Sequence, residues 1–395
     1  MKKMDFSKII EGGKEYYVPT STTDAPIPRK SDEVFFNTHQ KVNRDLSVLI
    51  LRTYCKIENK NSIKICEPFG GVGVRTCRYA VEVPSSNIYY NDFNPKAFKI
   101  AQKNFALLPD LNRNKILAYN KEFTDFLSLL YLDHPVMDFV DIDPYGTPIP
   151  FVHRSLKFVN LQGLLAFTAT DLASLSGLYP RAMYAKYGIG VFEARIGNVH
   201  ELAARSLITG IQRIGLTQNQ SLIPVFTFYY RHFIRVFMKR IRGVDRVLDH
   251  TGFLCQCQNC LRIFRVSLTV KERVCPSCEK NRIRSIGPLF LGKLHNDTYL
   301  SSLKDESHIK EINDTKTILK IIRLINEENK LNIPWSYDLQ TVAKKASSPI
   351  PPMDFIIEKL NEIGYKCYKT HYSGASLKTN ANFSDLCNII KAASD

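Results

Sequence analysis

The sequence contains no apolar run long enough to cross a membrane, and its first residues mix Lys, Asp and Glu without the apolar core of a secretion signal. It also has no internal repeat and no low-complexity tract. These absences exclude an integral membrane protein and a repeat array, and we expect a cytoplasmic location. With 395 residues, of which 44% are hydrophobic and 23% charged, the chain is long enough for two or three globular domains.

Acidic residues are scarce relative to basic ones. The 54 Lys and Arg exceed the 38 Asp and Glu and give a formal net charge of +16. Such an excess favours a polyanionic partner, although some proteins are basic for solubility alone. The ten cysteines indicate free thiols or metal ligands, because a disulfide scaffold belongs to secreted proteins.

The phosphate-binding motifs of nucleotide enzymes are missing from the first glycine-rich loop. The stretch Ile63–Arg75 has the order strand, acid, glycine-rich turn and helix, which is typical of the first βα unit of a doubly wound sheet. Gly70, Gly71 and Gly73 do not form G-x-G-x-x-G, and no Walker lysine follows. The glycines allow close backbone approach to a cofactor, and Glu67 suits one that carries an ammonium and no phosphate, as S-adenosylmethionine does.

A second acid follows the next predicted strand. Asp92 ends the strand over residues 86–92, about 20 residues after the glycine loop, where ribose hydroxyls lie in such folds. Asn94 and Pro95 then begin a helix as its N-cap and first residue. Asp92 is therefore a candidate ribose ligand, and its alternative role is that of a turn residue in front of Asn94.

An acid-Pro-aromatic turn follows a third strand. The apolar run Val136–Val140 reads as a buried strand, and Asp143, Pro144 and Tyr145 follow at its carboxyl end. The carboxylate and a backbone carbonyl can accept N–H bonds from a planar amine while the ring stacks on a flat base. Methyltransferases that act on nucleobase amines need such a clamp, although a Pro-Tyr-Gly sequence is more often only a turn.

From the first strand to about residue 242, predicted strands and helices alternate, as a mostly parallel α/β sheet requires. Residues 1–40 are expected to form an irregular arm. The other predicted elements of this region are a helix over residues 43–51, a buried strand over 162–170, and a late pair of strands over 226–230 and 233–239.

Two pairs of cysteines follow the sheet. Cys257 and Cys260 are separated from Cys275 and Cys278 by 14 residues, which is close to the spacing of a tetrahedral zinc ribbon. Four thiolates leave no open position on the metal, so the zinc is expected to be structural. Cys255 lies too near Cys257 to join the same turn and is expected to be a spare thiol.

The last hundred residues have a different pattern. Helices are predicted over residues 317–328, 338–345 and 353–363, and the alternating stretch 365–379 reads as a hairpin. Helices followed by a basic, aromatic hairpin resemble a winged-helix module. Lys366, Lys369 and Lys378 are candidate contacts to RNA phosphates, and the alternative is an ordinary solvated hairpin.

Together these motifs resemble the tRNA (guanine-26, N2) dimethyltransferases of archaea and eukaryotes. The resemblance covers nearly the whole chain and includes Thr370–Ser373 near its end. It implies a class I, Rossmann-like methyltransferase fold. With the patterns above, we expect a methyltransferase domain over 1–243 and a carboxyl-terminal α+β part, with a zinc ribbon region over 244–300 and a winged-helix-like RNA-binding region over 301–395. S-adenosylmethionine is the implied donor, and the guanine N2 amine at position 26 of tRNA the implied acceptor. The motifs that carry it are Asn43–Asp45, Glu67–Arg75, Asn91–Pro95, Asp141–Gly146 and Thr168–Asp171.

The resemblance also assigns roles to single residues. Arg44 and Arg75 match arginines that the family uses near the cofactor, and the fork of Arg44 suits the methionine carboxylate. Asp92 matches the ribose-binding acid and Asp143 the acid that faces the target amine. The alternative for either arginine is an ion pair with a neighbouring acid.

The sequence departs from the family after its third strand. The family's Asp-Ala-Asn, whose acid can bind the adenine amine, corresponds here to residues 118–120, which include Tyr119 and Asn120 but no acid. Adenine recognition then falls to backbone groups, Asn120 or another residue. Two other functions remain open at this point: an adenine-N6 methyltransferase acting on DNA or RNA, and a non-enzymatic RNA-binding protein with a zinc ribbon.

Overall fold

A computed structural model of the chain describes residues 5–20, 33–133, 136–192, 196–270, 273–304 and 315–393. Its contacts divide the chain into two compact units. Unit 1 comprises Met1–Thr168, Phe237–Arg240 and Asp297–Ile322, and unit 2 comprises Ala169–Val236, Ile241–Asn296 and Arg323–Asp395. The three-part division predicted from the sequence remains a prediction. Among the described residues, no helix is long and apolar enough to span a bilayer.

A seven-stranded sheet carries the glycine loop and the two acid-bearing turns. Its strand order is β5-β4-β3-β6-β7-β10-β9, and the pairs from β5 to β7 are parallel. This order confirms the predicted α/β fold with a mostly parallel, doubly wound sheet, and every predicted strand of this region is present. The strands are β3 (Ile63–Glu67), β4 (Ser85–Asn91), β5 (Ile116–Tyr119), β6 (Met137–Ile142), β7 (Val159–Ala169), β9 (Gln220–Tyr230) and β10 (Phe233–Arg242).

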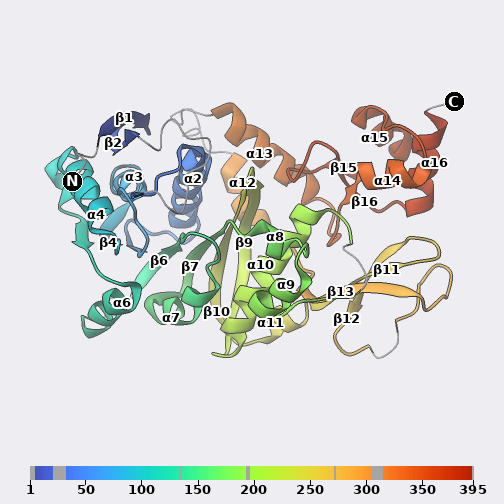
Figure 1. Cartoon of the computed structure of the whole chain (residues 1–395), viewed down its shortest axis with the longest axis horizontal. Coiled ribbons are helices and arrows are strands. Elements are labelled where there is room, and N and C mark those ends of the chain that lie inside the picture. The colour runs from blue at the N-terminus through green and yellow to red at the C-terminus, as the bar shows by residue number, and fades with distance from the viewer. Residues whose placement is uncertain are drawn as a thin grey trace. The chain divides into compact units, whose positions relative to one another are not determined.

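Helices cover the unit 1 strands on both faces. Figure 1 shows α2 and α3 on one side of β6 and α6 and α7 on the other. The predicted helix start after the glycine loop is confirmed, and Asn94 caps α4 by accepting the N–H bonds of Lys96 and Ala97. The helical segments of this unit include η1 (Thr38–Gln40), α2 (Lys41–Ile57), α3 (Val74–Glu82), α4 (Pro95–Ala106), α5 (Asp110–Arg113), α6 (Phe123–Leu132), α7 (Ile149–Ser155), η2 (Leu156–Phe158) and α12 (Asp297–Lys304).

The amino-terminal arm is more ordered than predicted. Strands β1 (Phe6–Glu11) and β2 (Lys14–Pro19) pair antiparallel around a turn at Gly12 and Gly13, both with positive φ. The prediction of an irregular arm is therefore wrong for this hairpin. The Pro-rich part of the predicted arm, at residues 26–28, lies outside the described residues.

The ribbon region forms a second sheet of order β12-β11-β13-β8. The paired cysteines lie at the end of β11 and in the turns that follow β11 and β12. The strands of this sheet are β8 (Gly190–Phe192), β11 (Thr251–Cys257), β12 (Ile263–Ser267) and β13 (Ile283–Phe290). The other helices up to this point are α8 (Leu172–Leu175), α9 (Pro180–Tyr187), α10 (Val199–Leu216) and α11 (Asp245–Leu248).

The carboxyl-terminal part contains the predicted helices and hairpin, and Asp338 caps α14 as expected. A further helix, α16, was not predicted. The elements are α13 (Thr315–Glu328), β14 (Tyr337–Asp338), α14 (Leu339–Ala346), α15 (Met353–Glu362), β15 (Cys367–Lys369), β16 (Ser376–Thr379) and α16 (Phe383–Ala392), and the strand order is β14-β16-β15.

One of the three lysines predicted to reach RNA from the hairpin is buried. Lys378 is 5% exposed, and its Nζ donates to Glu201 Oε1 at 2.9 Å. The prediction is wrong for Lys378, because all four residues of β16 are buried. Lys366 is exposed, and Lys369 forms an ion pair with Asp354 at 2.6 Å.

Candidate active site and metal centre

The glycine loop between β3 and α3 is held tightly against β4. The N–H of Gly70 donates to the Asn91 carbonyl at 2.8 Å, and the Tyr90 hydroxyl donates to the Gly71 carbonyl at 2.5 Å. A Cβ on Gly70 would lie 2.2 Å from the Tyr90 ring, so only glycine fits. Gly73 has φ +77° and begins α3, and a Cβ there would meet a buried ring at 2.7 Å. Both predicted glycines thus fix the backbone path of the loop at the carboxyl edge of the sheet.

Asp92 is attached to this loop. Its Oδ2 accepts the Gly71 N–H at 2.8 Å, and its Oδ1 accepts the Asn94 N–H at 2.9 Å. Burial raises the pKa of Asp92, and these two N–H bonds oppose the rise. Each oxygen keeps a further lone pair for a hydroxyl, as a ribose ligand requires. The cofactor role of Asp92 remains a prediction.

Asn120 lies beside Asp92. Its Nδ2 donates to the Asp92 carbonyl at 2.6 Å, across the neighbouring ends of β4 and β5. Tyr119 is the last residue of β5, and its half-buried ring lies 5.4 Å from that of Phe126. One amide hydrogen of Asn120 is therefore engaged, while the rest of the side chain stays available to a base.

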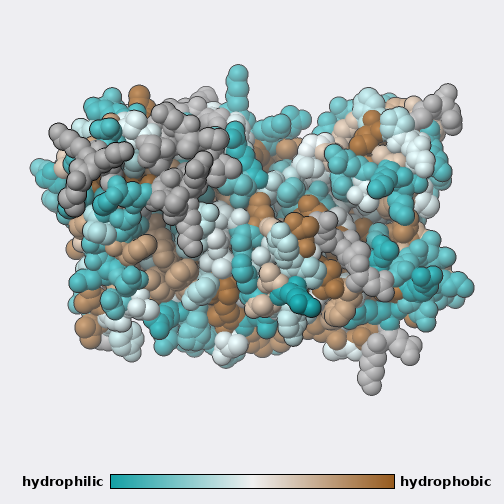
Figure 2. All heavy atoms as spheres, viewed as in Figure 1, coloured by the Kyte–Doolittle hydropathy of each residue, from teal (hydrophilic) through white to brown (hydrophobic). Residues whose placement is uncertain are grey.

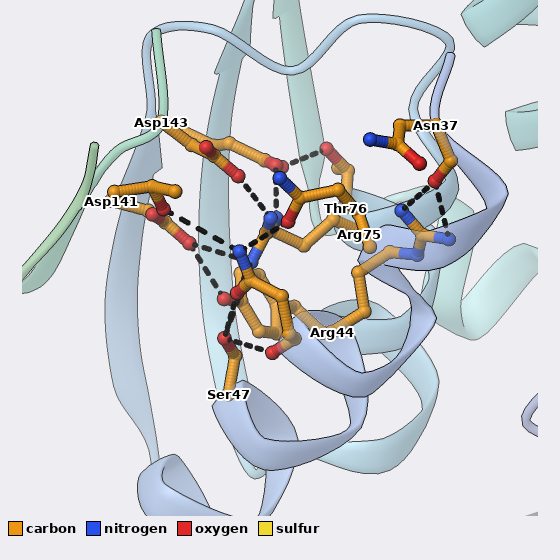
Figure 3. A network of polar contacts seen from close by, with 12 residues as sticks. Asn37, Arg44, Ser47, Arg75, Thr76, Asp141 and Asp143 are labelled. Atoms are coloured by element: carbon orange, nitrogen blue, oxygen red, sulfur yellow. Dashed lines mark hydrogen bonds and ion pairs between the residues drawn. The ribbon is translucent and has the colours of Figure 1, made fainter. Parts of the chain in front are cut away.

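Arg75 brings three carboxylates together beneath the loop (Figure 3). Its Nη2 pairs with Asp143, its Nη1 lies 3.5 Å from Asp141 Oδ2, and its Nε lies 3.4 Å from Glu67 Oε1. Burial by itself lowers the pKa of Arg75, but the carboxylates of Asp141 and Asp143 raise it above its ordinary value. The guanidinium is therefore always charged, and its ion pair with Asp143 fixes the position of that side chain. In this arrangement Arg75 contacts acids of the protein, and its predicted contact to a cofactor remains a prediction.

Two residues of α2 complete the surroundings of Arg75. Its Nη1 donates to Asn43 Oδ1 at 3.0 Å and to Ser47 Oγ at 3.2 Å. Sequence reasoning did not assign either residue. Their spacing of four on a predicted helix was an available signal, because such residues share one face.

Glu67 lies inside the protein, below the loop that it opens. It is 1% exposed and accepts a hydrogen bond from Thr76 Oγ1. Burial raises its pKa to about 8, and Asp141 adds to the rise while Arg75 opposes it. The predicted contact of Glu67 with an ammonium group stays a prediction, and the described contacts are with α3.

The acid-Pro-aromatic turn leaves β6 with its ring toward solvent. Asp143 is half-buried, Pro144 is buried, and Tyr145 is 58% exposed. The ring of Phe35 lies edge-on to that of Tyr145, with centroids 5.7 Å apart. Asp141 lies in β6 and Asp143 directly follows that strand, and the spacing of two residues in extended backbone was a signal that both acids share a face. The turn thus offers a fixed carboxylate and an accessible aromatic ring.

Arg44 has an intramolecular partner that the sequence did not suggest. Its Nε and Nη2 donate to the two carboxylate oxygens of Glu11 at 2.8 and 2.5 Å, and both side chains are buried. The guanidinium also lies 5.0 Å from the centre of the Phe36 ring. The binding of a cofactor carboxylate by Arg44, which the resemblance implied, remains a prediction. It requires that the guanidinium of Arg44 donate to the cofactor as well as to Glu11.

The four predicted cysteine ligands converge in the ribbon. Cys257 and Cys278 have Sγ atoms 3.6 Å apart, those of Cys260 and Cys275 are 3.5 Å apart, and all four lie within 4.8 Å of one another. Zn–S bonds of about 2.3 Å in a tetrahedron place sulfurs about 3.8 Å apart, so the set fits zinc. Cys255 is a buried free thiol outside the set.

Comparison with known proteins gives matches over almost the whole length. Residues 13–391 match the family model described as N2,N2-dimethylguanosine tRNA methyltransferase. A relative from Aquifex aeolicus, named tRNA (guanine(26)-N(2)/guanine(27)-N(2))-dimethyltransferase, is 30% identical over 388 residues, which cover 96% of this chain and 94% of the relative. A relative from Methanopyrus kandleri, named tRNA (guanine(26)-N(2))-dimethyltransferase, is 31% identical over 387 residues, with coverages of 96% and 95%.

A solved structure is similar over the same span. The complex of Trm1 from Pyrococcus horikoshii with S-adenosyl-L-methionine has a TM-score of 0.79 and 25% identity, and the match covers 98% of this chain and 100% of that one. The likeness therefore extends beyond the seven-stranded sheet to the ribbon and the carboxyl-terminal part.

Proposed function

The chain belongs to the N2,N2-dimethylguanosine tRNA methyltransferase family, and from this premise we propose that it transfers two methyl groups from S-adenosylmethionine to the N2 amine of guanine 26 in tRNA. The family match confirms the resemblance drawn from the motifs. It leaves the adenine-N6 methyltransferase and the non-enzymatic RNA-binding protein without support. We also propose a cytoplasmic location, which suits a tRNA substrate and ten free cysteines.

The observation that carries the proposal is the carboxylate of Asp143, fixed by Arg75 at the same sheet edge as Asp92. Gly71, which donates to Asp92, and Arg75, which pairs with Asp143, are four residues apart on one loop and helix. That loop therefore connects a carboxylate suited to ribose hydroxyls with one suited to an amine. S-adenosylmethionine, when bound here, supplies an electrophilic methyl group.

Asp143 acts mainly as a hydrogen-bond acceptor. The lone pair of a guanine amine is delocalised into the ring, and an N–H bond to a carboxylate draws it back onto nitrogen. Arg75 occupies Oδ2 of Asp143, which leaves Oδ1 for the substrate. A carboxylate is sufficient to take the departing proton, because the amine becomes strongly acidic once it carries the added methyl.

Tyr145 provides the stacking surface. Its exposed ring follows directly on Pro144, so a base whose amine meets Asp143 lies within reach of it. Stacking on an aromatic side chain contributes about 1–3 kcal/mol per base. Guanine 26 is stacked within folded tRNA, so the nucleotide has to be extruded before its amine reaches Asp143.

Labelled methyl transfer to tRNA transcripts tests the proposal. The wild-type protein with S-adenosylmethionine is expected to label a tRNA with guanine at position 26. It should leave unlabelled both a transcript with adenine there and a duplex DNA. Equal labelling of the two transcripts would remove position 26 as the target, and labelling at guanine 27 would extend the specificity to that of the Aquifex aeolicus relative.

We propose that Cys257, Cys260, Cys275 and Cys278 hold one structural zinc ion. The backbone N–H of Lys280 lowers the pKa of Cys278 to about 6, which favours a thiolate. Metal analysis of the purified chain should give one zinc per molecule, and Cys275→Ser should lose it. Cys255→Ser is the matched control, since that thiol lies nearby outside the set, and it should keep the metal.

A further inference from the structure

A polar groove of about 690 Å³ lies within unit 2, which does not contain Asp143. Three parts of the unit line it: the amino-terminal end of α10, the strands β11 and β12 of the ribbon, and the carboxyl-terminal module around α14 and β16. The volume is in the range of small-ligand sites and exceeds what a single nucleoside needs. No residue assigned to methyl transfer or to zinc lines it.

Apart from the carboxylate of Asp338, the polar groups of the groove are neutral and directional. Asn198 is 4% exposed, and its Oδ1 caps α10 by accepting the N–H bonds of His200 and Glu201. Its Nδ2 has no hydrogen-bond partner among the residues that the structure describes. Asn198 lines the groove, so this amide donor is available to a ligand there.

His200 lines the same wall and packs on a tyrosine that is not part of the lining. The ring of His200 stacks on that of Tyr229 with centroids 4.0 Å apart and an interplanar angle of 16°. Burial lowers the pKa of His200, while Asp338 opposes the shift, so the ring is neutral at neutral pH and offers one donor and one acceptor. Gln256 and Gln340 add two amides to the lining. Amides, a neutral imidazole and aromatic surfaces are the groups that proteins use to read unstacked bases.

The lining argues against a phosphate, and the surroundings argue for RNA. No Lys or Arg is among the described lining residues, and the only charge is the carboxylate of Asp338. Residues 251–290 nevertheless contain seven Lys or Arg and two Glu. Figure 2 shows hydrophilic side chains over this ribbon, on the right of the view. Arg262 immediately precedes Ile263 of the lining. A groove whose described lining has no cation, beside a basic surface, suits a base inside and phosphates outside.

We propose that this groove binds one unstacked nucleoside of the tRNA substrate, as a specificity site additional to the methyl-transfer site. The inference rests on the proposed function, because it takes tRNA as the ligand. Base-edge hydrogen bonds to the Asn198 and Gln340 amides would select the nucleotide. Its sugar-phosphate chain would leave toward the basic ribbon.

Gly374 offers a way to fill the groove without disturbing the fold. It lines the groove, and a Cβ built on it meets no atom within 4 Å. Gly374→Phe should therefore obstruct the groove, whereas the matched Gly374→Ala leaves it open. The only tryptophan of the chain, Trp335, lies next to Gly197 of the lining: a Cβ built on Gly197 would be 3.5 Å from the Cβ of Trp335. The fluorescence of Trp335 therefore reports on this region.

The experiment is a titration of the full-length protein with a tRNA transcript, followed by Trp335 fluorescence and by filter binding. Gly374→Phe is expected to weaken tRNA binding about tenfold and to abolish the fluorescence change, as loss of one base contact predicts. Gly374→Ala should behave as wild type. Equal tRNA affinity of Gly374→Phe and Gly374→Ala would overturn the proposal.

A second variant keeps the test valid if Gly374→Phe does not fold. Gln340 is exposed, and its side chain has no hydrogen-bond partner among the described residues, so Gln340→Ala should fold normally. We expect it to weaken tRNA binding about fivefold. The control is Gln102→Ala, at an exposed glutamine of α4 in unit 1, and equal affinities of these two variants would also overturn the proposal.

The two proposals fail separately. If the wild type binds tRNA with the expected dependence on Gly374 but methylates none, the groove stands and the proposed function falls. If tRNA is methylated and Gly374→Phe has no effect on affinity, the groove proposal falls and the function stands.

Discussion

The two units each contain a buried cluster of charged side chains, one with more acids than cations and the other with more cations than acids. In unit 1 the guanidinium of Arg75 contacts the carboxylates of Glu67, Asp141 and Asp143, so acids outnumber the cation. In unit 2 the carboxylate of Glu201 takes Lys378 Nζ and Arg205 Nη2, both at 2.9 Å, so the cations outnumber the acid.

The clusters also differ in exposure. All three side chains of the Glu201 cluster are at most 7% exposed, whereas the side chain of Asp143 is 17% exposed. A closed cluster serves stability, because removing one member leaves a buried charge unpaired. An open cluster with a surplus carboxylate can accept hydrogen bonds from a ligand. We therefore expect Asp143 to act in methyl transfer and Glu201 to stabilise the fold.

The largest effect is expected for Asp143→Ala. Loss of the acceptor should lower turnover on tRNA about 10²- to 10⁴-fold, the usual range for a group that handles a proton. Thermal stability and S-adenosylmethionine affinity should change little. Asp125→Ala, at an exposed position of α6, is the control and should be as active as wild type. Wild-type turnover of the Asp143 variant would end the comparison.

Lys378→Met should be the most destabilising change in the closed cluster. It removes one of the two cations around Glu201, and breaking a buried pair costs about 3–5 kcal/mol. The effect should lie toward the lower end, because Arg205 remains. Urea unfolding followed by Trp335 fluorescence measures it, with Lys366→Met as the exposed control on the same hairpin. Equal unfolding midpoints of the two variants would contradict the structural role.

Acid should destabilise unit 2 through Glu201. Burial by itself raises the pKa of Glu201, but Lys378 and Arg205 outweigh it and lower that pKa to about 2, below the ordinary 4.5. A carboxyl group whose pKa is lower in the folded than in the unfolded state stabilises the fold at pH values above its unfolded pKa. This stabilisation is lost as the pH falls from 4.5 to about 2. The loss amounts to about 3 kcal/mol. Urea unfolding at pH 6, 4.5 and 3 should show it, and Glu201→Gln should flatten that dependence.

Arg75→Lys should have the smallest effect on turnover or stability among these changes. It also tests most finely how the Arg75 cluster differs from the Glu201 cluster. An ammonium cannot match the fork that bridges three carboxylates, so Asp143 loses its fixed orientation and turnover should fall about tenfold. Arg205→Lys, the same change in the closed cluster, should lower the free energy of unfolding and leave turnover unchanged. If Arg75→Lys instead raises the KM for S-adenosylmethionine at constant turnover, the arginine acts on the cofactor, as the resemblance implied.

Most of the sheet could be predicted because its strands are continuous apolar runs that end in acids or glycines. The amino-terminal hairpin could not, because β1 alternates between exposed and half-buried residues and buries only its last, Glu11. The Gly12-Gly13 turn was the one local signal for it. Its contribution to the site, the pair Glu11–Arg44, joins residues 33 positions apart and has no local signature.

The acids of the site could be predicted because Asp92 and Asp143 each follow a strand directly, and parallel strands end at one edge. The environment of Arg75 could not, since it depends on how α2 and α3 pack. Lys378 shows the same limit: alternation in a hairpin defines two faces, but the sequence does not say which one meets α10.

Mass spectrometry of nucleosides from tRNA tests the account most directly. After incubation of tRNA with S-adenosylmethionine, the wild-type protein should yield N2,N2-dimethylguanosine, and Asp143→Ala should yield only unmodified guanosine. Dimethylguanosine formed by Asp143→Ala at the wild-type rate, or none formed by the wild type, would contradict it.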